Sequence, residues 1–262
     1  MWKFALAKKV KDSVVHKCKN KTRGLKRMYY KEYGNKEGQL VVFIHGGFTT
    51  NESFAKQYQL LPDKRMIFVD LPGCGKSECA GRKNFSFDDS AVEIIKLIKQ
   101  LSPEGKAILI AHSYGGLVVK EIIQRRPELI DKIVVGSTNV KKSLLFWLYT
   151  RKTGCHILWK QNKERYMHDG TTWRCICDMQ KDAWTKFSLS SMKTNKEIKS
   201  LFLVAEKDIK EIRESMKLWE KKFPDHESYT VKNSGHNYFT DFPEIVNPII
   251  IQFLNCKCAR YE

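Results

Sequence analysis

With 262 residues and 42% hydrophobic residues, the chain has the length of one large domain that can bury a sizeable core. Its apolar runs are far shorter than the ~18–20 residues of a membrane-spanning helix, which argues against stable membrane insertion. Its 47 Lys and Arg against 29 Asp and Glu give a net charge of +18. This excess could attract acidic substrates, an anionic membrane surface or nucleic acid, or it could simply keep the surface solvated. Because the lysines are spread along the chain without a dense basic run and interleaved aromatics, we expect a solvated surface and no nucleic-acid partner.

The N-terminal part predicts edge strands followed by a buried strand. Residues 1–9 are too short in their apolar part for a signal peptide, so we expect a cytoplasmic protein. Residues 10–33 alternate loosely and predict two edge strands joined as a hairpin around residues 20–24. Residues 40–44 are continuously apolar, as in a parallel strand covered on both faces. They end at His45-Gly46-Gly47-Phe48.

Helices and buried strands then alternate along the middle of the chain. The expected helices cover residues 50–61, 86–101 and 114–126, and the expected strands cover 66–69, 107–111 and 130–136. This alternation requires a mainly parallel sheet with helices on both faces. The loop Gly73-Cys74-Gly75-Lys76-Ser77 is not a phosphate-binding loop, because Asp70 stands where such a loop needs its first glycine.

The segment 140–194 differs in character from its surroundings. It is rich in aromatic residues among many Lys and Arg, and no Gly/Pro linker separates it from the rest. We therefore predict an insertion of short helices, a cap over a core formed by residues 1–139 and 195–262. Most of its aromatic side chains are expected to pack the cap, and a few to line a pocket. His156 and His168 receive no catalytic role.

A sharp strand-to-helix turn around Ser113 is the central feature of the sequence. An apolar strand runs into the serine, and small residues, Ala111 and Gly115, stand two positions to either side. Such a turn strains the serine backbone and raises its hydroxyl above the sheet, which is why the neighbours must be small. The usual form of this turn is Gly-x-Ser-x-Gly, from which Ala111 is a mild departure.

Five blocks of the chain, in their order and spacing, resemble those of the α/β-hydrolase fold family. They are a strand ending in His-Gly (40–47), an Asp-x-Pro-Gly-x-Gly-x-Ser loop (70–77), the serine turn (111–115), a strand delivering an acid (201–208) and a loop delivering a histidine (233–236). The resemblance covers roughly residues 25–140 and 196–256. It implies an α/β-hydrolase fold, in which a mainly parallel central sheet is flanked by helices and carries a helical cap.

The resemblance implies a catalytic triad of Ser113, Asp208 and His236, in the family's order. His236 stands in a Gly-His turn after the last predicted strand. Glu206 competes with Asp208 as the acid, but the preceding strand is followed by residues 137–139, which include no acid, and this favours Asp208.

The resemblance also assigns the oxyanion hole to two backbone N–H groups, those of Gly47 and Tyr114. Two fixed donors aimed at a developing negative charge in a dry site stabilise the transition state by about several kcal/mol. Phe48 is less suited as a donor, and His45 is expected to brace the turn.

Together these features predict a serine hydrolase, most simply an esterase acting on a small or medium carboxylic ester through an acyl-enzyme on Ser113. The pocket is predicted to include Phe48, His112, Trp147 and Phe239. A C–C bond hydrolase or an aminopeptidase with the same triad are alternatives, and a catalytically idle, ligand-binding member of the family is another. The chemistry needs no metal or organic cofactor, and the sequence specifies no oligomeric state.

The eight cysteines are expected to be free thiols, because a chain of this size does not need disulfides. Cys175-x-Cys177 and Cys256-x-Cys258 are spaced by one residue, whereas structural zinc pairs are spaced by two to four. We therefore predict no metal site.

Overall fold

The computed structural model describes residues 28–79, 84–168 and 172–255. Seven strands form one sheet in the order β1-β3-β2-β4-β5-β6-β7. The strands are β1 (Tyr30–Gly34), β2 (Leu40–Ile44), β3 (Arg65–Val69), β4 (Ala107–His112), β5 (Ile130–Gly136), β6 (Lys199–Ala205) and β7 (His226–Val231). Among the described strands, only β1, at one edge, runs antiparallel to its neighbour. The predicted mainly parallel sheet is confirmed.

The hairpin predicted over residues 10–33 is described only in part. Its second strand corresponds to β1, which pairs with β3 in the register Tyr30 to Val69. The first strand and the turn around residues 20–24 lie outside the described residues.

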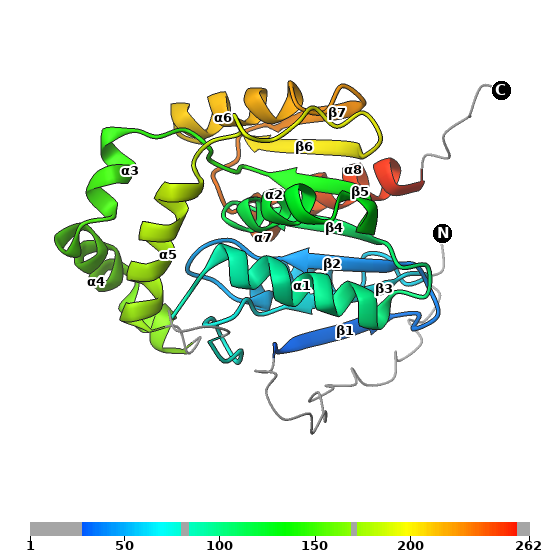
Figure 1. Cartoon of the computed structure of the whole chain (residues 1–262), viewed down its shortest axis with the longest axis horizontal. Helices are drawn as coiled ribbons and strands as arrows, with labels where there is room; N and C mark the ends of the chain where they lie inside the picture. The colour runs from blue at the N-terminus through cyan, green and yellow to red at the C-terminus, as the bar shows by residue number, and fades with distance from the viewer. Residues whose placement is uncertain (1–27, 80–83, 169–171, 256–262) are drawn as a thin grey trace, which may run out of the picture.

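Helices cover both faces of the sheet (Figure 1). They are α1 (Phe87–Leu101), α2 (Gly115–Arg125), α3 (Leu144–Tyr149), α4 (Lys152–His168), α5 (Trp173–Lys186), α6 (Lys210–Glu220), α7 (Tyr238–Asp241) and α8 (Pro243–Asn255), with the 3-10 helices η1 (Asn51–Gln57) and η2 (Pro127–Leu129). Within the described part of the chain, no helix is long and apolar enough to cross a membrane.

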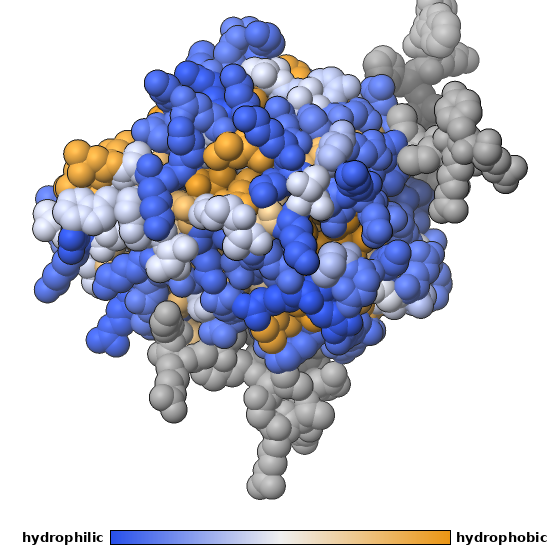
Figure 2. All heavy atoms as spheres, turned by 45° about the horizontal axis from the view of Figure 1, so that its top comes forward, coloured by the Kyte–Doolittle hydropathy of each residue, from blue (hydrophilic) through white to orange (hydrophobic). Residues whose placement is uncertain are grey.

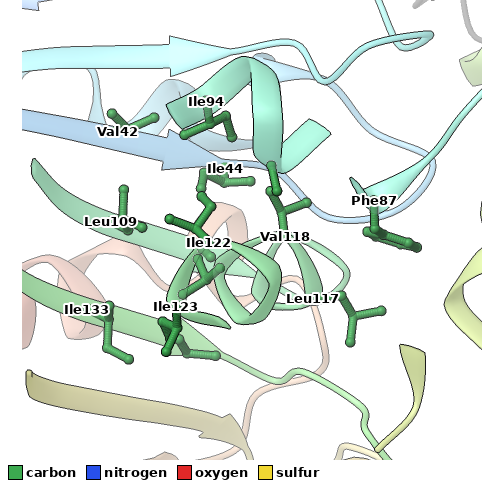
Figure 3. Close-up of a cluster of buried hydrophobic side chains, with 14 of the residues drawn as sticks. Val42, Ile44, Phe87, Ile94, Leu109, Leu117, Val118, Ile122, Ile123 and Ile133 are labelled. Atoms are coloured by element: carbon green, nitrogen blue, oxygen red, sulfur yellow. The ribbon is translucent and has the colours of Figure 1, made fainter. Parts of the chain in front are cut away.

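Alternation along each strand divides the core between the two faces. In β2, Val42 and Ile44 belong to the cluster under α1 and α2, whereas Val41 and Phe43 belong to the cluster on the side of η1 and α8. Figure 3 shows the first cluster, in which Val118 and Ile122 of α2 meet strand side chains. All five residues of β2 are buried, which explains why the strand reads as an unbroken apolar run.

The helix predicted over residues 50–61 is a 3-10 helix instead. Thr50 caps it, but Phe54 has non-helical dihedrals (φ −108°, ψ 19°). The backbone N–H and side-chain amide of Asn51 both donate to Asp70 Oδ1, at 2.8 and 2.6 Å. This anchoring, together with the burial of Phe54 and Gln57, overrides the local preference for an α-helix.

Helices α3, α4 and α5 stand between β5 and β6 in sequence and lie together at the end of the sheet to which the parallel strands point (Figure 1). This is the edge at which open α/β sheets present their functional loops. The serine turn after β4 and the loops after β6 and β7 emerge at the same edge.

Candidate active site

Ser113 stands at the apex of a tight turn between β4 and α2. Its φ of 53° is in the left-handed region that a non-glycine residue rarely adopts. Its N–H donates to the carbonyl of Gly136 at 2.7 Å, which ties the turn to β5. A Cβ on Gly115 would lie 2.3 Å from the carbonyl oxygen of Ile44, so the position two residues after the serine has no room for a side chain.

The structure brings the predicted nucleophile, base and acid together. The Oγ of Ser113 lies 3.0 Å from Nε2 of His236, and Nδ1 of the same ring lies 2.7 Å from Oδ1 of Asp208. The loops after β6 and β7 are joined by the Lys207 N–H, which donates to the Ser234 carbonyl at 3.0 Å. That bond holds the acid and the histidine within reach of each other.

Asp208 is buried, and donors surround both of its oxygens. Burial by itself would raise its pKa, but the hydrogen bond to His236 and the charge of that ring outweigh burial, so the pKa lies below its ordinary value. Ser137 Oγ and the Ala205 N–H donate to Oδ2, at 2.5 and 3.1 Å, and act in the same direction. The carboxyl group is therefore held in its ionised form.

Glu206, the competing acid, faces elsewhere. Its carboxylate accepts from Lys232 Nζ at 3.0 Å and from the Asn233 N–H at 2.8 Å. Asp208 is the acid that reaches His236.

The sequence analysis did not single out Ser137, although it named the residue among those that follow β5. Its φ of 44° lies in the left-handed region and directs its hydroxyl at Asp208. A polar residue directly after a central parallel strand was the only signal available.

The backbone N–H groups of Gly47 and Tyr114 flank Ser113. Within the described residues, neither N–H donates to a protein acceptor, which leaves both available to a ligand oxygen. A Cβ on Gly47 would lie 2.6 Å from a ring carbon of Tyr114, so the two residues pack against each other. Phe48 follows with φ 63°, in the left-handed region.

His45 braces this turn, as predicted. It is fully buried, and its Nε2 accepts the Leu71 N–H at 3.0 Å. Because Nε2 is an acceptor, Nδ1 carries the proton and donates to the Gly46 carbonyl at 2.7 Å.

Two cavities meet at Ser113, and Gly47 and His236 also line both. The first, of about 270 Å³, is completed by Gly46, Thr49, Ser53, Phe54, His112, Asn237, Phe239, Thr240 and Asp241. The second, of about 210 Å³, is completed by Phe48, Tyr114, Ser137, Asn139, Phe146, Tyr149, Leu158, Gln180 and Ile212. A substrate attached at the serine therefore has space in two directions.

Three of the four predicted pocket residues line a cavity. Phe48 lines the second, and His112 and Phe239 line the first. Trp147 lines neither: its ring instead stacks with the guanidinium of Arg151, 4.1 Å from the ring centroid.

The neighbours of Trp147 on α3 line the second cavity in its place. Phe146 and Tyr149 are three residues apart and so share one face of α3, whereas Trp147 projects about 100° away from Phe146. The composition of the segment indicated an aromatic lining, but not which face of α3 is turned inward.

His112 is buried beside the catalytic candidates, with its ring centroid 4.8 Å from that of His236. Burial, reinforced by the charge of His236, lowers its pKa to about 3. Its Nε2 is buried without a hydrogen-bond partner among the described residues. His112 is therefore neutral at working pH and adds no positive charge next to His236.

Within the described residues, no three His, Cys, Asp or Glu side chains gather as metal ligands would. Cys175 is buried with its sulfur 3.8 Å from that of Cys74, and both are free thiols. Cys256 and Cys258 lie outside the described residues.

Comparison with known proteins agrees with this architecture. A family model described as alpha/beta hydrolase fold matches residues 39–154, which include β2, β4 and the serine turn. A thermophilic esterase from Thermogutta terrifontis superposes with a TM-score of 0.73 at 17% identity, over 87% of this chain and 92% of that one. The chain therefore has the α/β-hydrolase fold, and the match to the family model lies in residues 39–154.

Two curated proteins match a shorter stretch of the chain. The uncharacterized hydrolase YugF of Bacillus subtilis is 33% identical over 109 residues, 41% of this chain and 40% of that protein. Epoxide hydrolase 1 of Caenorhabditis elegans is 32% identical over 110 residues, 41% of this chain and 27% of that protein. The chain thus spans well under half the length of either relative.

Proposed function

We propose that the protein is a serine hydrolase that cleaves a small or medium carboxylic ester through an acyl-enzyme on Ser113. The observation that carries the proposal is the continuous hydrogen-bond chain from Ser113 through His236 to the buried carboxylate of Asp208. A hydroxyl, a base and an orienting acid in this order are the requirements of nucleophilic acyl transfer. The known superfamily relatives named as hydrolases support the same reading.

The steps follow from the geometry. Ser113 Oγ attacks the ester carbonyl while its proton passes to Nε2 of His236, and Asp208 stabilises the resulting imidazolium. The N–H groups of Gly47 and Tyr114 hold the oxyanion. The ester C–O bond then breaks, and His236 gives its proton to the departing alcohol. Water repeats the sequence, with His236 as base, and releases the acid and free Ser113.

The two cavities suit the two halves of an ester. The second cavity is mainly aromatic and aliphatic, with Phe146, Tyr149 and Leu158 on its wall, and we assign the acyl chain to it. The first carries more polar groups, among them Thr49, and we assign the alcohol to it. In this proposal α3–α5, within residues 140–194, are the cap, because α3 and α4 supply the wall of the acyl cavity.

A fluorophosphonate probe tests the nucleophile. The wild-type protein should be labelled on Ser113, and Ser113→Ala should not be labelled. Turnover of a p-nitrophenyl ester should fall on the order of 10⁴-fold or more in Ser113→Ala. Ser137→Ala is the matched control, because it removes a nearby hydroxyl and should keep the label. Equal labelling of wild type and Ser113→Ala would end the proposal.

The alternative activities use the same serine and are separated by substrate. p-Nitrophenyl esters of rising chain length, compared with an aminoacyl amide and a C–C substrate, would rank them by kcat/KM. A chemistry that depends on an aspartate nucleophile is excluded by the serine at position 113. A protein that binds the probe reversibly but never forms a covalent adduct would instead be an idle, ligand-binding member of the superfamily.

A further inference from the structure

Helices α3 and α4 expose aliphatic side chains that the interior of a globular protein would normally bury. Leu144 is 71% exposed, and Leu145, Leu148 and Ile157 are 43%, 47% and 48% exposed. We call these four residues the α3–α4 patch. Figure 2 shows apolar atoms gathered at the end of the molecule where Figure 1 places α3.

The patch is one continuous region of two helices in contact. Leu144 and Leu148 are four residues apart and lie on the same face of α3. The end of α3 meets the start of α4 closely, because a Cβ on Gly154 would lie 2.2 Å from the Leu148 carbonyl oxygen. Ile157 follows one helical turn after Gly154. The patch is therefore the outer face of a helical pair.

These exposed residues are not needed to pack the segment. Phe146, Tyr149 and Leu158 of the same two helices already face inward and line the second cavity. Both helices thus carry apolar side chains on two faces, and no part of the chain that the structure describes covers the outer face. An exposed apolar surface of this kind marks an interaction site.

The charge carried by residues 141–163 has one sign, although Lys141 pairs with Glu214 of α6. Residues 141–163 contain six Lys or Arg and no Asp or Glu. Lys142, Arg151, Lys152 and Lys160 are exposed. An apolar helical face bordered by basic side chains is the pattern of a surface that lies in the headgroup region of an anionic bilayer.

We propose that the α3–α4 patch is a membrane-docking surface that binds anionic phospholipid bilayers peripherally. The aliphatic side chains would enter the boundary between headgroups and acyl chains, and the basic rim would pair with lipid phosphates and carboxylates. A second copy of the chain is disfavoured as occupant, because a two-fold contact through the patch would bring two basic rims together. A protein partner is disfavoured because lysine is depleted from protein interfaces.

Vesicle co-sedimentation of the full chain tests the proposal without any need for catalysis. The wild-type protein should sediment with phosphatidylcholine vesicles that contain phosphatidylserine and stay in solution with phosphatidylcholine alone. Binding should weaken as salt is added, because the electrostatic part is screened. Ser113→Ala should bind like the wild type, which separates this proposal from the proposed hydrolase activity.

Two double variants test the two parts of the surface. Leu144→Ser with Leu148→Ser should lower the vesicle partition coefficient at least about tenfold, because two apolar side chains no longer enter the bilayer. Lys152→Gln with Lys160→Gln should lower it by about tenfold, because two charges near the lipid surface are lost. All four side chains are exposed, so thermal unfolding should stay unchanged.

The matched controls lie elsewhere on the molecule. Lys99→Gln with Lys106→Gln removes the same charge near the start of β4, at the opposite end of the sheet. Leu218→Ser removes an exposed leucine of α6. Both should bind vesicles like the wild type.

Three results would overturn the proposal. One is a wild-type protein that does not sediment with phosphatidylserine vesicles. Another is undiminished binding by the Leu144→Ser, Leu148→Ser variant. The third is a dimer in solution that this variant dissociates while vesicle binding is absent, which would assign the patch to a second copy of the chain.

Discussion

The Nδ1 of His236 lies 2.7 Å from Oδ1 of Asp208, although the two residues follow different strands, β7 and β6. A carboxylate can only accept, so Nδ1 of His236 carries the proton and Nε2 is free to accept the hydroxyl of Ser113. One contact between two loops therefore fixes the tautomer that the proposed reaction requires.

Replacing Asp208 and Glu206 one at a time should show which of the two carboxylates the reaction needs. Asp208→Asn is expected to lower kcat for an ester by about 10⁴-fold, because an amide does not hold the required tautomer or stabilise the imidazolium. Glu206→Gln should change kcat by less than about threefold, since Glu206 bonds to Lys232 and Asn233 instead. Steady-state kinetics on both variants gives the comparison. Comparable losses in the two would mean that the assignment of the acid is wrong.

Removing the hydroxyl of Ser137 should lower the free energy of unfolding in a pH-dependent way. Ser137→Ala takes away a donor to the buried carboxylate, so the pKa of Asp208 should rise toward its ordinary value. A lowered carboxyl pKa stabilises the fold above the unfolded value of about 4, and this contribution is lost as the pH falls through the folded value. Ser137→Ala should therefore cost about 1.5–3 kcal/mol at pH 7.

Urea unfolding measures that loss. The difference between wild type and Ser137→Ala should be full at neutral pH and shrink in acid below about pH 4. An equal loss at both pH values would show that the hydroxyl does not act through the charged carboxylate. The kcat of Ser137→Ala should fall only several-fold, because the contact between Asp208 and His236 remains.

A methyl group on Gly47 should disturb the proposed oxyanion hole. Its Cβ would lie 2.6 Å from a ring carbon of Tyr114, so the buried ring or the Gly47 backbone must shift. We expect Gly47→Ala to lower kcat by about 10²-fold, with a smaller change in KM, because the loss falls on the transition state.

Gly235→Ala is the matched control for that variant. It adds the same methyl next to His236 at a position with no heavy atom within 4 Å. Its kcat should stay near the wild-type value. Equal losses of kcat in the two glycine variants would mean that the clash with the Tyr114 ring is not the cause of the loss in Gly47→Ala.

The buried imidazole of His112 should make the fold sensitive to mild acid. Its pKa of about 3 lies below the ordinary histidine value of about 6.5, so between these values only the unfolded chain binds the proton. The free energy of unfolding should therefore decrease as the pH falls through this window, by up to ~1.4 kcal/mol per pH unit.

His112→Phe keeps an aromatic ring among His236, Tyr238 and Phe239 and removes the titrating group. Its unfolding free energy should fall less steeply than that of the wild type between about pH 6.5 and pH 5. At pH 7 the variant should lose about 1 kcal/mol, because the hydrogen bond between His112 and the backbone of His236 is gone, whereas Nε2 has no partner to lose within the described residues. Parallel pH curves for the two proteins would contradict the assignment.

The core architecture follows from local patterns in the chain. The strand at residues 40–44 is unbroken in its apolar character because it is covered on both faces, and β2 is fully buried. Residues 86–101 carry a serine cap, an acidic first turn and an apolar face, and α1 begins directly after Ser86, whose side chain accepts the Asp89 N–H. Helix caps and apolar periodicity depend on residues that are only a few positions apart, so the sequence alone reveals them.

By itself, the sequence determined the order of strands and helices, the serine turn, and the loops that deliver an acid and a histidine. The tertiary structure placed Asp208, the acid that the sequence favoured, against His236. It alone decided that Ser137 supports the acid, and that Phe146 and Tyr149 rather than Trp147 line the cavity. The physical reason is the distance along the sequence between the residues that interact. Periodicity reports on neighbours a few positions away, whereas Ser113 and His236 are 123 residues apart and meet only through the register of the strands between them.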